Sequence, residues 1–147
     1  MDKLHGLVAL LLTALAVSAC TPVRPAETEL MVSYVPVEEI ETEQQRVVSA
    51  FVEHRDGCFS ARNAEKTVVT RGGAKEYRLM NQDRSLELRI AARPEGKQLR
   101  LTLSNWTERR FRQRDAVCYQ EAVDLLKRLY GPERVEVRDE CPGGCVR

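Results

Sequence analysis

The residues of this chain best suited to chemistry are its cysteines, of which there are five. If Cys20 is set aside, an even number remains, which in an oxidising compartment predicts two disulfides. We expect Cys58–Cys118, because Cys118 falls on the buried face of one predicted helix and Cys58 follows the other. We also expect Cys141–Cys145, because Cys141-Pro-Gly-Gly-Cys145 is a compact loop with two glycines. A crossed pairing with the C-terminal pair stays open.

The C-terminal pair has a second interpretation, in which Cys141 and Cys145 act as a redox couple. Thiol oxidoreductases place two residues between their cysteines, at the start of a helix that lowers the pKa of the first thiol. Here three residues intervene in a Gly-rich tail, which favours a structural clip. A redox-responsive sensor that uses Cys141 and Cys145, in the envelope location that the N-terminus discussed below implies, is the alternative function. Zinc is not predicted, because Cys58 and Cys118 each stand apart from other cysteines.

Catalytic constellations are not evident. His54 is the one histidine beyond the first 19 residues, and we expect it on the surface, stabilised by the C-terminus of a helix. One histidine provides no convincing Ser-His-Asp set, and Gly72-Gly73 and Gly143-Gly144 are typical of turns rather than of phosphate-binding loops. We expect a protein that is not an enzyme. A small periplasmic enzyme would need a cleft with perturbed carboxylates.

The densest basic segment is Glu108–Arg114, which predicts a binding surface. Guanidinium groups make bidentate contacts with phosphate and carboxylate, so the expected ligands are anionic lipid headgroups or an acidic envelope protein. A lone tryptophan just before this segment is expected in strand-end or core packing, or as an interface anchor. The candidate binding residues are Trp106, Arg109, Arg110, Arg112 and Arg114.

The same cluster has a plainer interpretation. Three further arginines are candidates to extend it over an exposed sheet face: Arg84, Arg89 and Arg100. Alternatively, the arginines belong to a solvated face and pair with nearby carboxylates. Those carboxylates would be Glu87, Glu108 and Asp115.

The N-terminus has the three parts of an export signal: a positive Lys3, an apolar run over Leu7–Val17, and the small residues Ser18 and Ala19 before Cys20. The apolar run is shorter than the roughly 20 residues that cross a bilayer as a helix. Val17-Ser18-Ala19-Cys20 resembles the lipobox of bacterial lipoproteins, with Val17 in place of the commoner leucine.

This resemblance implies a lipid anchor. In that family the signal is cleaved before the cysteine, which carries S-diacylglycerol and an N-acyl chain such as palmitate. Thr21 follows where inner-membrane retention usually shows Asp, so the resemblance implies an outer-membrane lipoprotein that faces the periplasm. The buried acyl chains, at about 0.8 kcal/mol per CH2, would hold it there. No cofactor beyond this covalent lipid is expected.

Composition is consistent with that environment. The net charge is +1, with acidic and basic residues interspersed, which argues against a nucleic-acid partner. The sequence predicts a cleaved signal over 1–19, a lipidated Cys20 with an extended tether over 20–37, and one domain over 38–147. Prolines and glutamates over 21–29 indicate the tether, about 30 Å when stretched. Leu30–Val35 is predicted as a short edge strand.

Two amphipathic helices are predicted. The first spans 42–55, with Thr42 and Gln45 as a capping box. Gln44 faces away from its apolar stripe of Val47, Val48, Phe51 and Val52. The second spans 113–130, with an apolar face of Cys118, Ala122, Leu125, Leu126 and Leu129. It ends at Gly131 and Pro132.

Between these helices the apolar residues alternate with period two. The clearest strands are 86–91 and 99–104, joined by the turn Pro94-Glu95-Gly96-Lys97. Earlier strands are predicted at 66–70 and 77–79, and a last one at 135–137. The expected fold is α+β: an antiparallel meander of about four to five strands, with two helices packed on one face. The expected function is a non-enzymatic accessory or scaffold in cell-envelope assembly.

Overall fold

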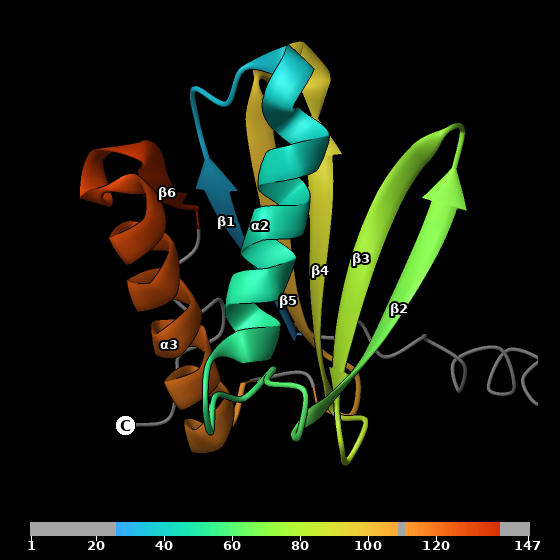
Figure 1. Cartoon of the computed structure of the whole chain (residues 1–147). Helices are drawn as coiled ribbons and strands as arrows, with labels where there is room; N and C mark the ends of the chain where they lie inside the picture. Colours follow the sequence, from blue (N-terminus) through green and yellow to red (C-terminus); the bar gives the residue numbers. More distant parts are fainter. Residues whose placement is uncertain (1–25, 109–110, 139–147) are drawn as a thin grey trace, which may run out of the picture.

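The computed structural model describes residues 26–108 and 111–138. Within them the chain forms a six-stranded antiparallel sheet with two helices on one face (Figure 1), which confirms the α+β class. The strand order is β2-β3-β4-β5-β1-β6. The main elements are β1 (Ala26–Val32), α2 (Ile40–Glu53), β2 (Ala64–Arg71), β3 (Ala74–Asn81), β4 (Leu86–Arg93), β5 (Gln98–Asn105), α3 (Gln113–Tyr130) and β6 (Val135–Val137). Short 3-10 turns span Val37–Glu39, Pro94–Gly96 and Pro132–Arg134.

The strand β1 begins earlier than predicted and has a different place in the sheet. It pairs with β5 along its whole length and with β6 over Leu30–Val32, so it lies inside the sheet. The tether predicted over 20–37 was therefore wrong from Ala26 onward, and the domain begins before residue 38. The strand predicted at Leu30–Val35 forms part of β1, but it is not an edge strand. Glu27 and Glu29 give the segment a polar composition, but they alternate with Thr28 and Leu30, which are 1 % exposed. This is the period of a strand with one face in the core.

The meander β2–β5 follows the predicted hairpins. Arg71 faces Ala74 across Gly72-Gly73, whose φ angles of 57° and 83° suit glycine in a two-residue turn. Strands β4 and β5 pair in full register, with Ile90 opposite Leu101. The hairpin β2–β3 extends beyond the helices (Figure 1), and β2 forms the edge of the sheet.

The first helix differs from its prediction. It begins at Ile40, and Glu39 at its N-cap makes no side-chain capping bond, so the expected capping box is absent. Gln44 is 2 % exposed rather than solvent-facing. Its Nε2 donates to the carbonyls of Lys75 (2.8 Å) and Ile90 (2.9 Å). A hydrophobicity pattern cannot detect a polar side chain that is satisfied inside the core.

The second helix matches its prediction, and a disulfide joins it to the chain after α2. Cys58 and Cys118 are bonded, with their Cα atoms 5.6 Å apart, as expected. The Cys58 N–H also donates to the Glu121 carboxylate of α3, at 3.0 Å. Cys141 and Cys145, and the bridge predicted between them, lie outside the described residues.

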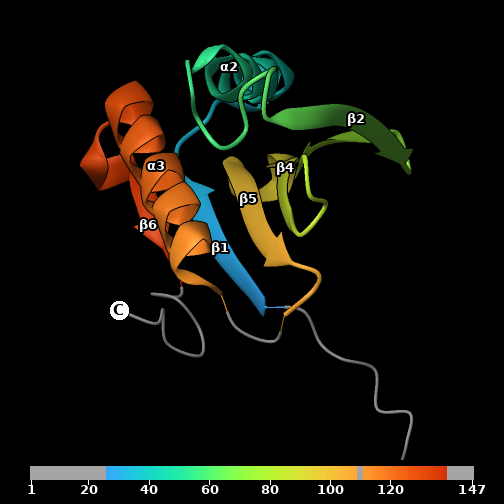
Figure 2. The ribbon, with the colours of Figure 1, turned by 90° about the horizontal axis from the view of Figure 1, so that it is seen from below.

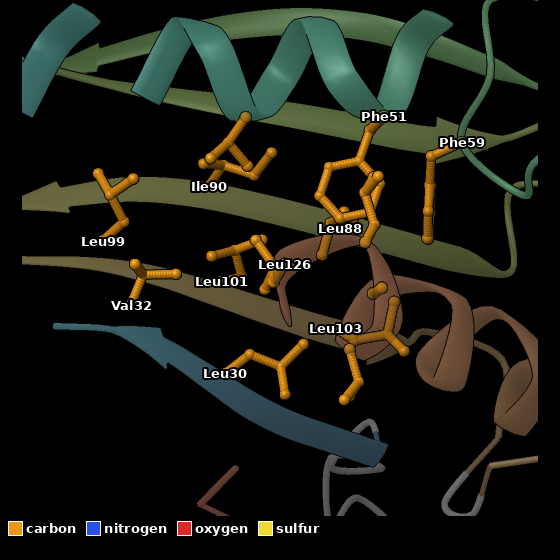
Figure 3. Close-up of a cluster of buried hydrophobic side chains, with 14 of the residues drawn as sticks. Leu30, Val32, Phe51, Phe59, Leu88, Ile90, Leu99, Leu101, Leu103 and Leu126 are labelled. Carbon is orange, nitrogen blue, oxygen red and sulfur yellow. The ribbon is translucent and has the colours of Figure 1, made fainter. Parts of the chain in front are cut away.

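The core lies between the helices and the sheet. Side chains from β1, β4 and β5 point toward α2 and α3 (Figure 3). Phe51 and Phe59 meet edge to face, with ring centroids 6.2 Å apart. The labelled core residues are Leu30, Val32, Phe51, Phe59, Leu88, Ile90, Leu99, Leu101, Leu103 and Leu126. In the described part of the chain, neither helix has the length and apolar character needed to cross a membrane.

Candidate functional site

Most of the predicted binding residues lie at one end of the sheet. Ala26, the first residue of β1, is paired with Asn105, the last residue of β5. The Ala26 N–H donates to the Glu108 carbonyl at 3.2 Å. Trp106 directly follows β5, and α3 begins at Gln113 (Figure 2). We call the surface formed by Asp83, Trp106, Thr107, Arg112 and Arg114 the Trp106 end.

A buried polar pair organises the Trp106 end. Asn105 and Asp115 are 0 % and 1 % exposed. Asn105 donates from Nδ2 to the Asp115 carboxylate at 2.6 Å, which links β5 to the first turn of α3. Asp115 also accepts from the Arg112 N–H at 2.8 Å, as an acidic residue does at a helix N-terminus. The Asn105 Oδ1 accepts from the backbone N–H groups of Thr107 (2.9 Å) and Glu108 (3.0 Å). Asn105 therefore fixes the segment that carries Trp106.

Trp106 itself lies at a strand end and is half-exposed, with 49 % of its surface open. Its backbone N–H donates to the Ser85 carbonyl at 2.9 Å, which holds the segment against the β3–β4 turn. An amphipathic indole held at the surface in this way is typical of interfaces where one side is apolar and the other wet.

The arginines of this end that the structure describes both have acidic partners. Arg112 Nε lies 3.7 Å from an Asp115 carboxylate oxygen. Arg114 donates to the Asp83 carboxylate and, at 3.2 Å, to the Ser85 hydroxyl. These contacts agree with the plainer interpretation, in which arginines pair with nearby carboxylates. Arg114 therefore ties α3 to the β3–β4 turn, whereas the contact of Arg112 is with the first turn of its own helix.

Arg109 and Arg110 lie outside the described residues. The described residues on either side of them are Glu108, which accepts from Ala26, and the buried Phe111. Glu108 directly follows Thr107, and Phe111 directly precedes Arg112, so the two flanking residues adjoin the Trp106 end.

Of the three further arginines, Arg89 and Arg100 lie on β4 and β5 and Arg84 lies in the β3–β4 turn, and all three pair with carboxylates. Arg89 pairs with Glu27 at 2.8 Å and with Glu87 at 3.5 Å. Arg100 pairs with Glu29, and Arg84 pairs with Glu65. The sheet face away from the helices is therefore a mixture of both signs of charge rather than a basic surface.

Asp83 has an unusual pKa for a residue this exposed. The Ser85 hydroxyl donates to its carboxylate at 2.5 Å, and the Ser85 N–H does so at 3.1 Å. The hydrogen bond from the Ser85 hydroxyl is the largest cause that lowers the Asp83 pKa from 3.8 to about 2. The Ser85 N–H and Arg114 lower the pKa further, and desolvation opposes them. Asp83 therefore stays ionised well into acid.

Asp83→Asn is expected to destabilise the domain slightly at neutral pH, and the difference from wild type is expected to vanish in acid. The folded pKa, about 2, lies below the unfolded value of 3.8, so the ionised group stabilises the fold above pH 3.8 and loses this effect as the pH falls toward 2. The difference stays small because both partners are partly exposed. Urea unfolding of both proteins across this pH range measures it. A difference that grew in acid would contradict the assignment.

The remaining candidate is His54, which caps the C-terminus of α2 as expected. It lines a hollow of about 400 Å³ with the loop after α2. In the described residues, no group of three or more histidine, cysteine, aspartate or glutamate residues is arranged to hold a metal ion.

Sequence reasoning missed Asn105, Asp83 and Gln44. The sequence held a signal only for Asp115, the residue of α3 that accepts from Asn105. Asp115 is the third residue of α3, a position where a carboxylate is typical of a helix start.

No protein-family model matches the chain, and no curated protein matches its sequence.

Proposed function

We propose that this protein is a non-enzymatic lipoprotein, anchored to the outer membrane through acylated Cys20 and facing the periplasm. In this proposal the Trp106 end lies against anionic headgroups. The rest of the domain acts as an accessory or scaffold in envelope assembly by binding another envelope protein.

One observation carries the proposal. The strand that leads from Cys20 into the domain begins at the Trp106 end, because Ala26 is paired with Asn105 and bonded to Glu108. Residues 21–25 separate Cys20 from Ala26 and extend at most about 20 Å. A lipid on Cys20 would therefore bring this end of the domain, rather than the β4–β5 turn, to the membrane surface.

The chemistry of the Trp106 end suits that position. Tryptophan is enriched where a membrane meets water, and each basic residue near an anionic surface contributes about 1 kcal/mol. Arg109 and Arg110 would supply that attraction, since Arg112 and Arg114 already pair with Asp115 and Asp83. The open sheet face has both signs of charge, so it suits a protein partner better than a uniformly anionic bilayer.

Arg109→Gln with Arg110→Gln is expected to weaken binding to vesicles containing phosphatidylglycerol about 30-fold, from two charges at about 1 kcal/mol each. The measurement is vesicle sedimentation of the domain carrying Cys20→Ser, so that headgroup contact is separated from the lipid anchor. The matched control is Arg93→Gln with Lys97→Gln, which removes the same charge near the opposite end of the sheet and is expected to change little. If both variants lost the same amount of vesicle binding, the effect would depend only on net charge, and the proposed orientation would be contradicted.

The scaffold role is tested in cells with the anchored protein. Crosslinking followed by purification is expected to recover one reproducible envelope protein from the wild type. If no protein is recovered, the scaffold role fails and lipid binding alone remains.

A further inference from the structure

The strand β2 is an unusually open edge of the sheet. In the described residues nothing pairs with its outer side, since the sheet order ends at β2. All eight of its residues pair with β3 without a bulge, and the strand holds no proline. Natural proteins usually interrupt or cover such an edge, because its free N–H and C=O groups are a template for another strand. Its centre, Thr67-Val68-Val69-Thr70, is β-branched throughout, and Val68 is 49 % exposed.

The turn fixes which residues present backbone groups to that edge. Arg71 and Ala74 flank the two-residue Gly72-Gly73 turn, so they form the hydrogen-bonded pair that closes the hairpin. Because hydrogen-bonding direction alternates along a strand, every second residue before Arg71 also faces β3. The residues whose backbone N–H and C=O groups point away from β3, which we call outward-facing, are therefore Lys66, Val68 and Thr70.

Charge then selects a partner. When two copies of β2 run antiparallel with Val68 opposite Val68, Lys66 lies opposite Thr70 and the outward backbone groups meet. This register also places Glu65 of each copy opposite Arg71 of the other. If the strands are shifted in either direction to the next register in which outward-facing residues lie opposite each other, both Glu65–Arg71 pairs are lost. Arg71 has no ion pair in the described part of the chain, and Glu65 has one weak contact, with Arg84, at 3.2 Å between exposed groups.

We propose that β2 pairs with β2 of a second copy of this chain, antiparallel and centred on Val68, so that two sheets join across a two-fold axis. Directly opposite residues on neighbouring strands have Cβ atoms roughly 5 Å apart, which suits both ion pairs. The interface is small, so the dimer is weak in solution. Concentration of copies on a membrane, which rests on the proposed anchor, favours it.

The test uses the full-length chain in bacterial membranes with Val68→Cys. We expect a disulfide-linked dimer above the wild-type background, because Cα atoms of a hydrogen-bonded pair lie about 5.5 Å apart, within disulfide range. Lys75→Cys, exposed on the inner strand of the same hairpin, is expected to give no such dimer. Adding Glu65→Arg or Arg71→Glu to Val68→Cys is expected to lower the dimer yield at least several-fold, and adding both together is expected to restore it.

The yield of the disulfide-linked dimer in further variants tests the pairing of β2 with β2. Arg84→Gln removes the existing partner of Glu65 and is expected to leave the yield unchanged. The register would be overturned if the single charge reversals left the dimer yield unchanged. It would also be overturned if the double reversal did not restore the yield. A crosslink from Val68→Cys to a different protein would make β2 a site for a partner strand and overturn self-pairing. These results do not depend on vesicle binding by Arg109 and Arg110, so failure here and failure of the proposed membrane contact are distinguishable.

Discussion

Replacing Cys58 and Cys118 together by serine is expected to lower the free energy of unfolding by about 4 kcal/mol. The bridge closes a loop with a sequence separation of 60 residues. In the chain-entropy model, a cross-link of this span lowers the conformational entropy of the unfolded chain, which corresponds to about 4 kcal/mol of stability. Since small domains are stable by only about 5–15 kcal/mol, the loss takes a large share of the total. Urea unfolding under non-reducing conditions measures it.

The folded geometry supports a clean comparison. In the double variant the Cys58 N–H can still donate to Glu121, so the loop keeps one tie to α3. A reductant is expected to lower the stability of the wild type by a similar amount and to leave the double variant unchanged. A loss below about 1 kcal/mol would show that the unfolded chain is not constrained by this bridge.

Asp115→Ala is expected to cost about 3 kcal/mol, because it leaves the buried Asn105 amide and the Arg112 N–H without their acceptor. The loss should appear in thermal or urea unfolding. It should also change the emission of Trp106, the chain's one tryptophan, since Asn105 holds the following segment.

Asp115→Asn is the matched control. It keeps one carbonyl oxygen in the same place but loses the charge beside Arg112, so a smaller loss is expected. An Asp115→Ala protein within about 0.5 kcal/mol of wild type would mean that the pair is not a structural tie.

The elements predicted correctly are those with local signals. The helix α3 ends at Gly131 before Pro132, where the chain cannot continue as a helix, and the β4–β5 hairpin follows strict alternation of leucine and isoleucine with polar residues. The Cys58–Cys118 bridge followed from placing the two helices side by side. Each of these conclusions needed only neighbouring residues or one packing assumption.

The errors arose where a side chain's environment depends on distant parts of the chain. Glu27 and Glu29 suggested a tether, but β1 pairs with β5. Their partners are Arg89 of β4 and Arg100 of β5. Gln44 suggested a solvent-facing position, but carbonyls of β3 and β4 satisfy it. Composition over a short window cannot reveal such partners.

The proposed orientation of the domain is tested by the depth of its single tryptophan relative to the membrane. The acylated full-length protein is reconstituted into vesicles whose lipids carry a fluorescence quencher at headgroup depth. The comparison is Trp106→Phe with Tyr34→Trp, which moves the tryptophan to the opposite end of β1, where Tyr34 is 78 % exposed. If the Trp106 end faces the headgroups, we expect strong quenching for the wild type and little for the relocated tryptophan. Equal quenching at both ends, or quenching only of the relocated tryptophan, would contradict it.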